Sequence, residues 1–245
     1  MSNAAESVSN HAGEAHSDSI GARLNWLRAG VLGGNNGIVS VAGIVVGVAG
    51  ATTDRNTILM AGVAGLVAGA LSMATGEYVS VSTQRDTERA LLDKERRELR
   101  EMPDEELAEL TAIYQGKGLS PALAHQVAVE LTAHDAFAAH VDVELGIDPD
   151  ALTNPWHASL ASAVSFTVGA LLPLLAIMLP PTAAQVPVTF AAVLVALALT
   201  GWVSARLGGA DPRRAVLRNV GGGVLAMVVT YGVGALVGGF TLTTG

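Results

Sequence analysis

Carboxylate and imidazole side chains recur at helical spacing in one strongly charged stretch of the sequence. The candidate metal ligands there are Glu95, Glu98, Glu106, Glu109, His140 and Glu144. The first four glutamates form two pairs three residues apart, and the histidine lies one helical turn before the last glutamate, so each pair shares a helix face. Glutamates with one imidazole and no thiolate suit Fe(II) and Mn(II), with Zn(II) and Co(II) also possible. On spacing alone, an acidic helix face that is only solvated explains the same pattern.

A second set of polar residues lies within apolar runs, where polar side chains usually face a cavity or a partner. Met73 and Glu77 are four residues apart on one helix face and pair a soft thioether with a hard carboxylate. Such a pair holds a borderline transition metal loosely. Asn35 and Asn36 lie in the preceding apolar run and can coordinate through their carbonyl oxygens. The alternative is that Met73 fills the core and Glu77 is interfacial.

The composition indicates a membrane protein. Of 245 residues, 50% are hydrophobic and 15% charged, which is too apolar for an ordinary soluble domain of this size. Residues 85–150 contain 16 of the 22 acidic side chains but only 7 of the 14 Lys and Arg, which favours a cation partner over a nucleic acid. There is no cysteine, which excludes thiolate zinc sites and cysteine nucleophiles. Neither a Ser-His-Asp arrangement nor a phosphate loop is present, so we expect no enzyme activity and no prosthetic group.

Five apolar runs are each long enough to span a membrane. They cover residues 30–51, 57–83, 160–179, 186–205 and 220–242. Arginines precede the first run, follow the second and lie between the last two, which by the positive-inside rule places these segments in the cytoplasm. The N-terminus and the acidic insert are therefore predicted to be cytoplasmic, and the C-terminus to lie outside.

The chain is predicted to be an all-α membrane protein with a cytoplasmic three-helix acidic insert between spans two and three. Its parts are a disordered tail without signal-peptide features over 1–22, spans one and two over 23–84, a metal-binding helical domain over 85–150, and spans three to five over 151–245.

Helix start and stop signals divide the insert. Nothing breaks the helical pattern between Glu77 and Glu101, so the first insert helix is expected to continue span two. Pro103 ends that helix, and Asp104 is expected to be the N-cap of the second. Ser120 and a proline after it start the third, on which Glu130 precedes His140 and Glu144, near the same stripe.

Four segments resemble the vacuolar iron transporter family in its bacterial form. They are GGNNGIVSVAGIVVGVAGA, AGALSMATGEYVS, ERRELREMPDEELAEL and VELG, and the resemblance runs from about Leu24 to the C-terminus. It implies a five-span homodimer of the bacterial inner membrane that exchanges cytoplasmic Fe(II), and often Mn(II), for protons. It also implies that the path is lined by span one of each subunit, with a cytoplasmic domain collecting the metal. The positions matching the family's metal ligands are Glu95, Glu98, Glu106, Glu109 and Glu144 in the insert and Met73 in span two.

The departures from that family concern acids and thioethers. Asn36 stands where the family usually has an aspartate, and Gly65 stands where some members have a glutamate. An amide cannot carry a proton. Glu77 is therefore the acid of the predicted spans that remains to supply proton coupling. His140 stands near VELG where some relatives have methionine, and imidazole favours divalent over softer monovalent ions.

The function predicted from these observations is export of Fe2+, with Mn2+ as a second candidate ion, in exchange for protons. The residues expected to line the path are Asn36, Met73 and Glu77. One alternative is a membrane-tethered metal sensor or store that binds through the insert and moves nothing. Another is a di-iron oxidase, which would need Glu-x-x-His pairs that Glu130 and His134, four residues apart, do not provide.

Overall fold

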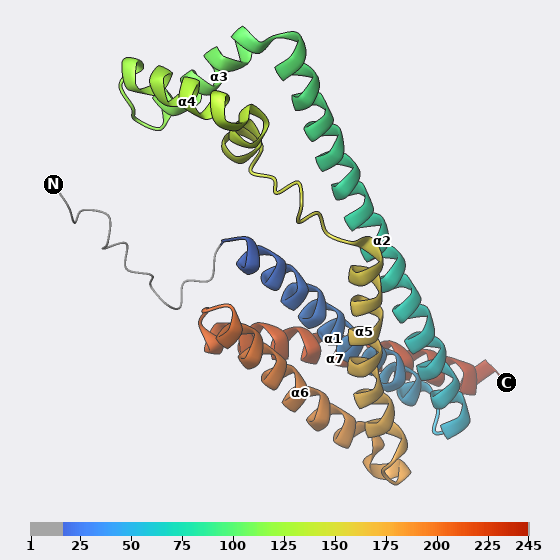
Figure 1. Ribbon diagram of the computed structural model, residues 1–245. Coiled ribbons are helices and arrows are strands. Elements are labelled where there is room, and N and C mark those ends of the chain that lie inside the picture. Colours follow the sequence, from blue (N-terminus) through green and yellow to red (C-terminus); the bar gives the residue numbers. More distant parts are fainter. Residues whose placement is uncertain (1–16, 245) are drawn as a thin grey trace. The chain divides into compact units, whose positions relative to one another are not determined.

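The computed structural model describes residues 17–244, with side chains from Gly30 to Phe240. The chain divides into two compact units, each treated by itself below. The bundle unit comprises the residues up to Glu77 together with those from Trp156 onward, and the insert unit is Tyr78–Pro155. All regular elements in the described residues are helices (Figure 1).

The order of elements agrees with the predicted all-α fold. The helices are α1 (Ser17–Ala51), α2 (Arg55–Glu101), α3 (Pro103–Gly116), α4 (Pro121–His140), the π-helix η1 (Val141–Leu145), α5 (Pro155–Met178), the 3-10 helix η2 (Thr182–Ala184), α6 (Gln185–Leu207) and α7 (Pro212–Thr244). Five segments of these helices are long and apolar enough to cross a membrane. They are Gly30–Ala51, Arg55–Glu101, Pro155–Met178, Thr182–Leu207 and Pro212–Phe240. The prediction of five membrane helices is thereby confirmed.

Some element ends differ from the predicted ones. Helices α5 and α7 begin several residues before the apolar runs they contain, because Pro155 and Pro212 occupy first helical positions, where a fixed φ and a missing N–H are favourable. Helix α1 begins at Ser17, so the disordered tail predicted for residues 1–22 is too long at its C-terminal end; serine and aspartate at 17 and 18 are types that favour helix starts. Residues 1–16 of that tail lie outside the described residues.

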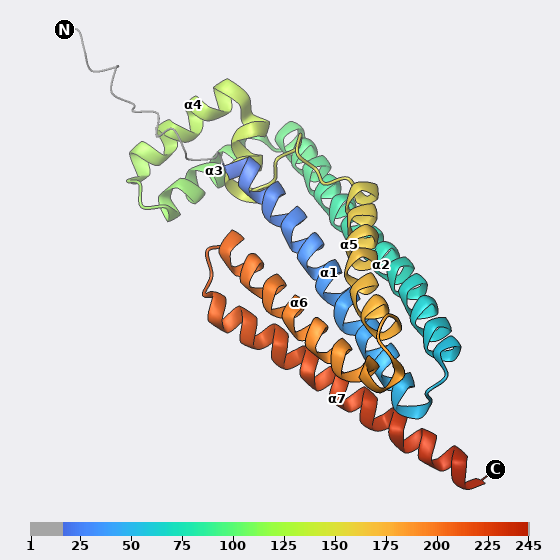
Figure 2. The ribbon, with the colours of Figure 1, turned by 90° about the horizontal axis from the view of Figure 1, so that it is seen from below.

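Helix α1 supplies the centre of the bundle unit. Val41, Ala42, Val45 and Val46 are fully buried in the apolar core, together with Phe166 of α5 and residues of α6 and α7. Figure 2 shows α6 and α7 side by side, with α1 along them. The outward faces of α2, α5 and α7 expose many large apolar side chains, as expected for helices surrounded by lipid.

Glycines allow the helices of the bundle unit to approach closely. A Cβ atom at Gly169 of α5 would collide with the carbonyl oxygen of Gly34 in α1, and one at Gly234 of α7 would collide with that of Gly47. Small residues commonly permit such backbone contact between membrane helices. The close contacts of α1 with α5 and α7 therefore depend on these glycines.

The insert unit contains the end of α2, followed by α3, α4 and η1. Ser120 is the N-cap of α4 and Pro121 its first residue, as predicted. Met102, and not Asp104, is the N-cap of α3, because Pro103 itself takes the first helical position. Asp104 instead lies in an acidic first turn, whose negative charges interact favourably with the dipole of the helix.

Helix α4 is interrupted where the sequence indicates a continuous helix. Asp135 has φ −159° and ψ 96°, and its Oδ1 accepts a hydrogen bond of 2.9 Å from the N–H of Ala138, as an N-cap would. The following segment ends in the π-turn η1 and at Gly146, whose φ of 60° suits glycine. This break changes the helical register between Glu130 and His140.

Candidate metal sites

Three carboxylates and one imidazole converge within the insert unit. They belong to Glu95 of α2, Glu106 of α3, His140 at the end of α4 and Glu144 of η1, and one ligand atom from each lies within 4.8 Å of all the others. The Nδ1 atom of His140 is 3.1 Å from Oε1 of Glu95 and 3.5 Å from an Oε2 of Glu106 and of Glu144. We call these four residues the insert cluster.

Local features of the chain bring the insert cluster together. A single non-helical residue, Met102 with φ −137° and ψ 52°, separates α2 from α3, so Glu106 follows Glu95 after a sharp change of direction. The interruption at Asp135 and the π-turn after His140 then set the direction of the last two ligands. Helix α4 also packs on α3. A short π-helical segment of this kind is frequent at functional sites.

Three polar atoms of the insert cluster are buried without hydrogen-bond partners among the described residues. The side chains of His140, Glu95 and Glu106 are 0%, 3% and 6% exposed, whereas that of Glu144 is 25% exposed. Among the described side chains, Oε1 of Glu95 and both ring nitrogens of His140 have no partner with hydrogen-bond geometry. Burying such atoms unpaired is unfavourable, and a cation coordinated among the carboxylates would satisfy Oε1 of Glu95 and Nδ1 of His140. The donor set therefore fits a divalent metal.

Burial also changes the acidity of the cluster. Desolvation raises the pKa of Glu95 above its ordinary value, neighbouring carboxylates led by Glu144 raise it further, and His140 opposes this rise. Desolvation likewise raises the pKa of Glu106, with the same opposition from His140. Without a cation the buried carboxyls therefore retain protons to a higher pH than exposed glutamates do.

The other predicted insert ligands lie beside this cluster. Glu98 is bound to Nζ of Lys94 at 2.6 Å, and Glu109 is exposed to solvent. Both carboxylates are close enough to raise the pKa of Glu106 by charge repulsion. Glu130, which was expected near the same stripe, is exposed and accepts a hydrogen bond of 3.2 Å from Gln126. It lies outside the cluster because the interruption of α4 at Asp135 changes the helical register between Glu130 and His140.

Two of the predicted path residues are in direct contact within the bundle unit. Nδ2 of Asn36 in α1 donates a hydrogen bond of 3.1 Å to Sδ of Met73 in α2. Oδ1 of Asn36 accepts one of 3.0 Å from the hydroxyl of Ser40. Glu77 is half-buried one turn beyond Met73 and has no hydrogen bond or ion pair with another described residue. The structure thus brings Asn36 and Met73 together, and Glu77 stands apart from their hydrogen bond.

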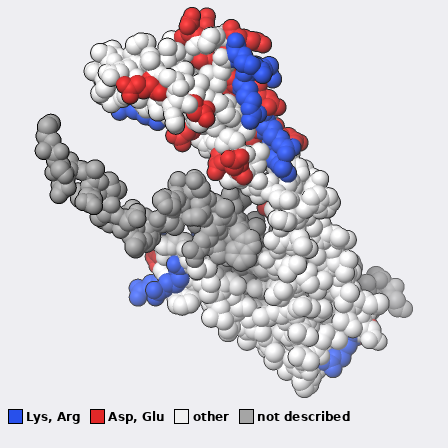
Figure 3. Space-filling view, in the orientation of Figure 1, with Lys and Arg blue, Asp and Glu red and all other residues white. Residues whose placement is uncertain are grey.

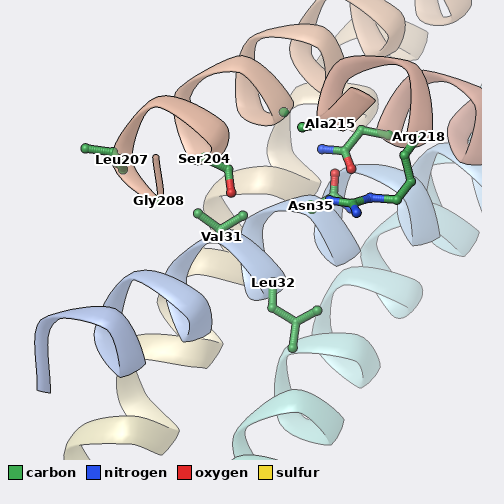
Figure 4. A pocket seen from close by; sticks show the side chains of 10 residues that line it. Val31, Leu32, Asn35, Ser204, Leu207, Gly208, Ala215 and Arg218 are labelled. Carbon is green, nitrogen blue, oxygen red and sulfur yellow. The ribbon is translucent and has the colours of Figure 1, made fainter. Parts of the chain in front are cut away.

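Arg218 lies near this pair, although its position in the sequence indicated only a role in membrane topology. A cavity of about 360 Å3 is lined by Asn35 of α1, Ser204 of α6 and Arg218 of α7, and in Figure 4 the side chain of Arg218 extends toward Asn35. A cavity of about 480 Å3 is lined by Asn36 together with Asn35 and Arg218. Oδ1 of Asn35 is buried and has no hydrogen-bond partner among the described residues. The only available signal was an arginine next to an apolar run, which topology alone explains.

The fold defines an integral membrane protein, and its insert unit carries a cluster of side chains that could hold a metal ion. The model of the VIT family matches residues 27–235, and the chain belongs to this family. It is 42% identical over 231 residues to a "Vacuolar iron transporter" of Acanthamoeba castellanii, covering 91% of this chain and 83% of the relative. It is 41% identical over 218 residues to "Vacuolar iron transporter homolog 1" of Oryza sativa subsp. japonica, covering 89% of this chain and 76% of the relative. The family resemblance seen in the sequence is confirmed.

Proposed function

We propose that this protein is a membrane transporter that exports Fe2+, and also Mn2+, from the cytoplasm in exchange for protons. The observation that supports this most strongly is the insert cluster, a group of three carboxylates and one imidazole in which Glu95 and His140 have buried polar atoms without partners. It occurs in a chain whose relatives are named iron transporters. Oxygen and nitrogen donors without thiolate suit Fe(II) and Mn(II), and Zn(II) and Co(II) remain alternative ions.

In the first step the insert unit captures the ion. Its excess of acidic side chains, visible among the charges of Figure 3, raises the local concentration of cations. The insert cluster then binds the metal, and protons held by Glu95 and Glu106 are released, because ligands must be deprotonated to coordinate. Glu98 and Glu109 contribute charge beside the bound ion.

In the second step the ion passes between α1 and α2. Rotation of the Asn36 amide would break its bond to Met73 and present a carbonyl oxygen and a thioether sulfur to the same ion. Neutral donors of this kind bind a transition metal weakly, which permits its release. Glu77, the remaining acid of the predicted spans, is assigned the proton that moves in the opposite direction.

The proposed transporter is a homodimer in the bacterial inner membrane, with its N-terminus and insert in the cytoplasm and its C-terminus outside. Ser72 and Thr75 are exposed on the apolar part of α2, and a second copy covering them would shield their hydroxyls from lipid. No nucleic acid and no prosthetic group take part in this scheme.

One observation favours the alternative, a membrane-tethered metal sensor or store without flux. Arg218 lines the same cavity as Asn36, and its fixed positive charge would repel a divalent cation there. Under this alternative the insert cluster binds metal as before, and no metal crosses the bilayer.

Metal uptake by proteoliposomes separates the two functions. With an inward metal gradient, we expect the wild type to take up Fe2+ and Mn2+, and Met73→Ala and Glu77→Gln to reduce the rate strongly. Met60→Ala is a matched control, because Met60 lies on the same helix and is 66% exposed. Glu101→Gln serves the same purpose for the acid. Metal binding with no flux of any ion would establish the sensor or store.

A further inference from the structure

Arginines line a cavity in the insert unit on the side of α2 away from the metal ligand Glu95. The cavity has a volume of about 330 Å3 and is lined by Arg85, Arg89, Leu92, Asp93, Arg96, Pro149, Asp150 and Leu152. The spacings of the three arginines, four and seven residues, place them within roughly 40° of one another around the helix. Figure 3 shows basic side chains in a row along this part of α2.

The positive charge in this cavity is only partly compensated. Arg96 is bound to Asp93 at 2.9 Å, and its guanidinium stacks on Phe137 with 4.5 Å to the ring centroid. Arg85 and Arg89 form no ion pair with another described residue, although Asp150 lines the opposite wall. Nε of Arg85 is buried and has no acceptor among the described groups. A buried guanidinium N–H without an acceptor is unfavourable, so an anionic group that accepts a hydrogen bond from it would be bound favourably in this cavity.

We propose that this cavity binds a phosphate group, supplied by the headgroup of an anionic phospholipid. Planar guanidinium groups bind phosphate through paired N–H···O bonds, and two of them are available side by side. Arg85 comes two residues after the apolar run that ends at Thr83, where headgroups are expected. Basic clusters directly beyond the cytoplasmic end of a span commonly bind acidic lipids. Leu92 and Leu152 add apolar surface that suits an amphiphile.

The experiment uses the full-length protein in neutral detergent micelles. Native mass spectrometry measures binding of a phosphatidylglycerol, of a phosphatidylcholine and of inorganic phosphate to the wild type and to an Arg85→Gln/Arg89→Gln variant. We expect phosphatidylglycerol to bind more tightly than phosphatidylcholine to the wild type. We expect the double variant to bind phosphatidylglycerol roughly tenfold more weakly or worse, since it loses charge-assisted hydrogen bonds from two guanidinium groups to the phosphate.

A matched control and a conservative variant keep the result interpretable. Arg97→Gln removes the same charge from an exposed position on another face of α2, so it should bind phosphatidylglycerol as the wild type does. Arg85→Lys/Arg89→Lys retains the charge without the planar fork and should lose less affinity than the glutamine variant. Asp150→Asn should strengthen binding, because it removes a carboxylate from the cavity wall.

The binding measurements can support the proposal or show that it is wrong. If millimolar inorganic phosphate displaces the lipid in the wild type but has no effect in the glutamine variant, the cavity binds phosphate and the soluble ion competes as a source. If phosphatidylglycerol and phosphatidylcholine bind alike and phosphate does not bind, the proposal is wrong. Equal loss in the Arg97→Gln control would also overturn it, because the effect would then be one of net charge. Helicity measured by circular dichroism and elution as one species show that each variant is folded.

Discussion

The insert cluster and the Asn36–Met73 pair are two candidate metal sites with opposite chemistry. The insert cluster combines three carboxylates with an imidazole, and three of its four residues are buried. The pair in the bundle unit has an amide and a thioether and no formal charge. Charged groups are expensive within a bilayer, so donors of a membrane path are neutral where possible. The insert unit can hold several acids together, because solvent, protons or a metal can compensate their charge. From this difference we infer that the insert cluster binds the metal tightly and that the Asn36–Met73 pair binds it weakly during transport.

Removing a carboxylate from the insert cluster should have the largest effect. Glu95→Ala is expected to weaken Mn2+ binding by roughly 100-fold, since one of four ligands and its charge are lost. Isothermal titration calorimetry of the full-length protein measures this loss.

Glu109→Gln is the matched control for that experiment, because Glu109 is exposed and lies outside the four ligands. It should lose only the smaller contribution of a nearby charge. Equal losses in both variants would mean that the insert binds metal by diffuse electrostatic attraction and has no defined cluster.

The pH dependence of metal binding should distinguish the insert cluster from the Asn36–Met73 pair, because only the cluster contains acidic groups. The pKa values of Glu95 and Glu106 are raised, chiefly by burial, so protons compete with the metal from the ordinary pKa of a glutamate up to the raised values. Across that window we expect affinity for Mn2+ to rise by about tenfold per pH unit for each carboxyl that must lose a proton. Titration calorimetry at several pH values, in buffers of different ionisation enthalpy, counts the protons released.

The metal-free protein should show the opposite trend. A carboxyl whose pKa is higher in the folded state binds more protons there than in the unfolded chain, so stability falls as pH rises through the window. Thermal unfolding of the metal-free protein measures this fall, and saturating Mn2+ should reverse it. A metal-free stability that increases with pH over the same range would contradict the raised pKa values.

Restoring an acid to the bundle unit should make the two sites more alike. In Asn36→Asp the carboxylate would keep the bond from Ser40 and lose the one to Met73, which frees the sulfur beside an anionic oxygen. We expect a several-fold faster uptake of Mn2+ by proteoliposomes and a steeper dependence on an imposed pH gradient.

Asn35→Asp adds the same charge one residue away, in the cavity lined by Arg218, where the carboxylate is expected to pair with the guanidinium. It should therefore give no gain in coupling. If Asn36→Asp leaves both the rate and its pH dependence unchanged, the amide at this position does not limit proton coupling.

The sequence predicted continuous elements better than their interruptions. The continuity of α2 follows from the absence of a breaker, and the start of α4 at Ser120 and Pro121 follows from strong local signals. The non-helical Asp135 within α4 has no comparable signal, because its conformation depends on packing and on the cap it forms for Ala138. Helical spacing alone therefore predicted that Glu130 lies near the candidate ligands. It also could not show that Glu95 and Glu106 belong to the insert cluster while Glu98 and Glu109 lie outside it.

A change of ligand type within the insert cluster should have the smallest effect and gives the finest comparison of the two sites. His140→Met replaces imidazole with the thioether that Met73 provides in the bundle unit, and keeps a side chain of similar volume in a fully buried position. We expect the ratio of Mn2+ to Cu+ affinity to fall a few-fold, because sulfur prefers the softer ion. His134→Met is the control, since His134 is exposed on α4 and outside the cluster. Competition with chelators specific for each ion measures the ratio, and an unchanged ratio would mean that the carboxylates alone determine which metal is bound.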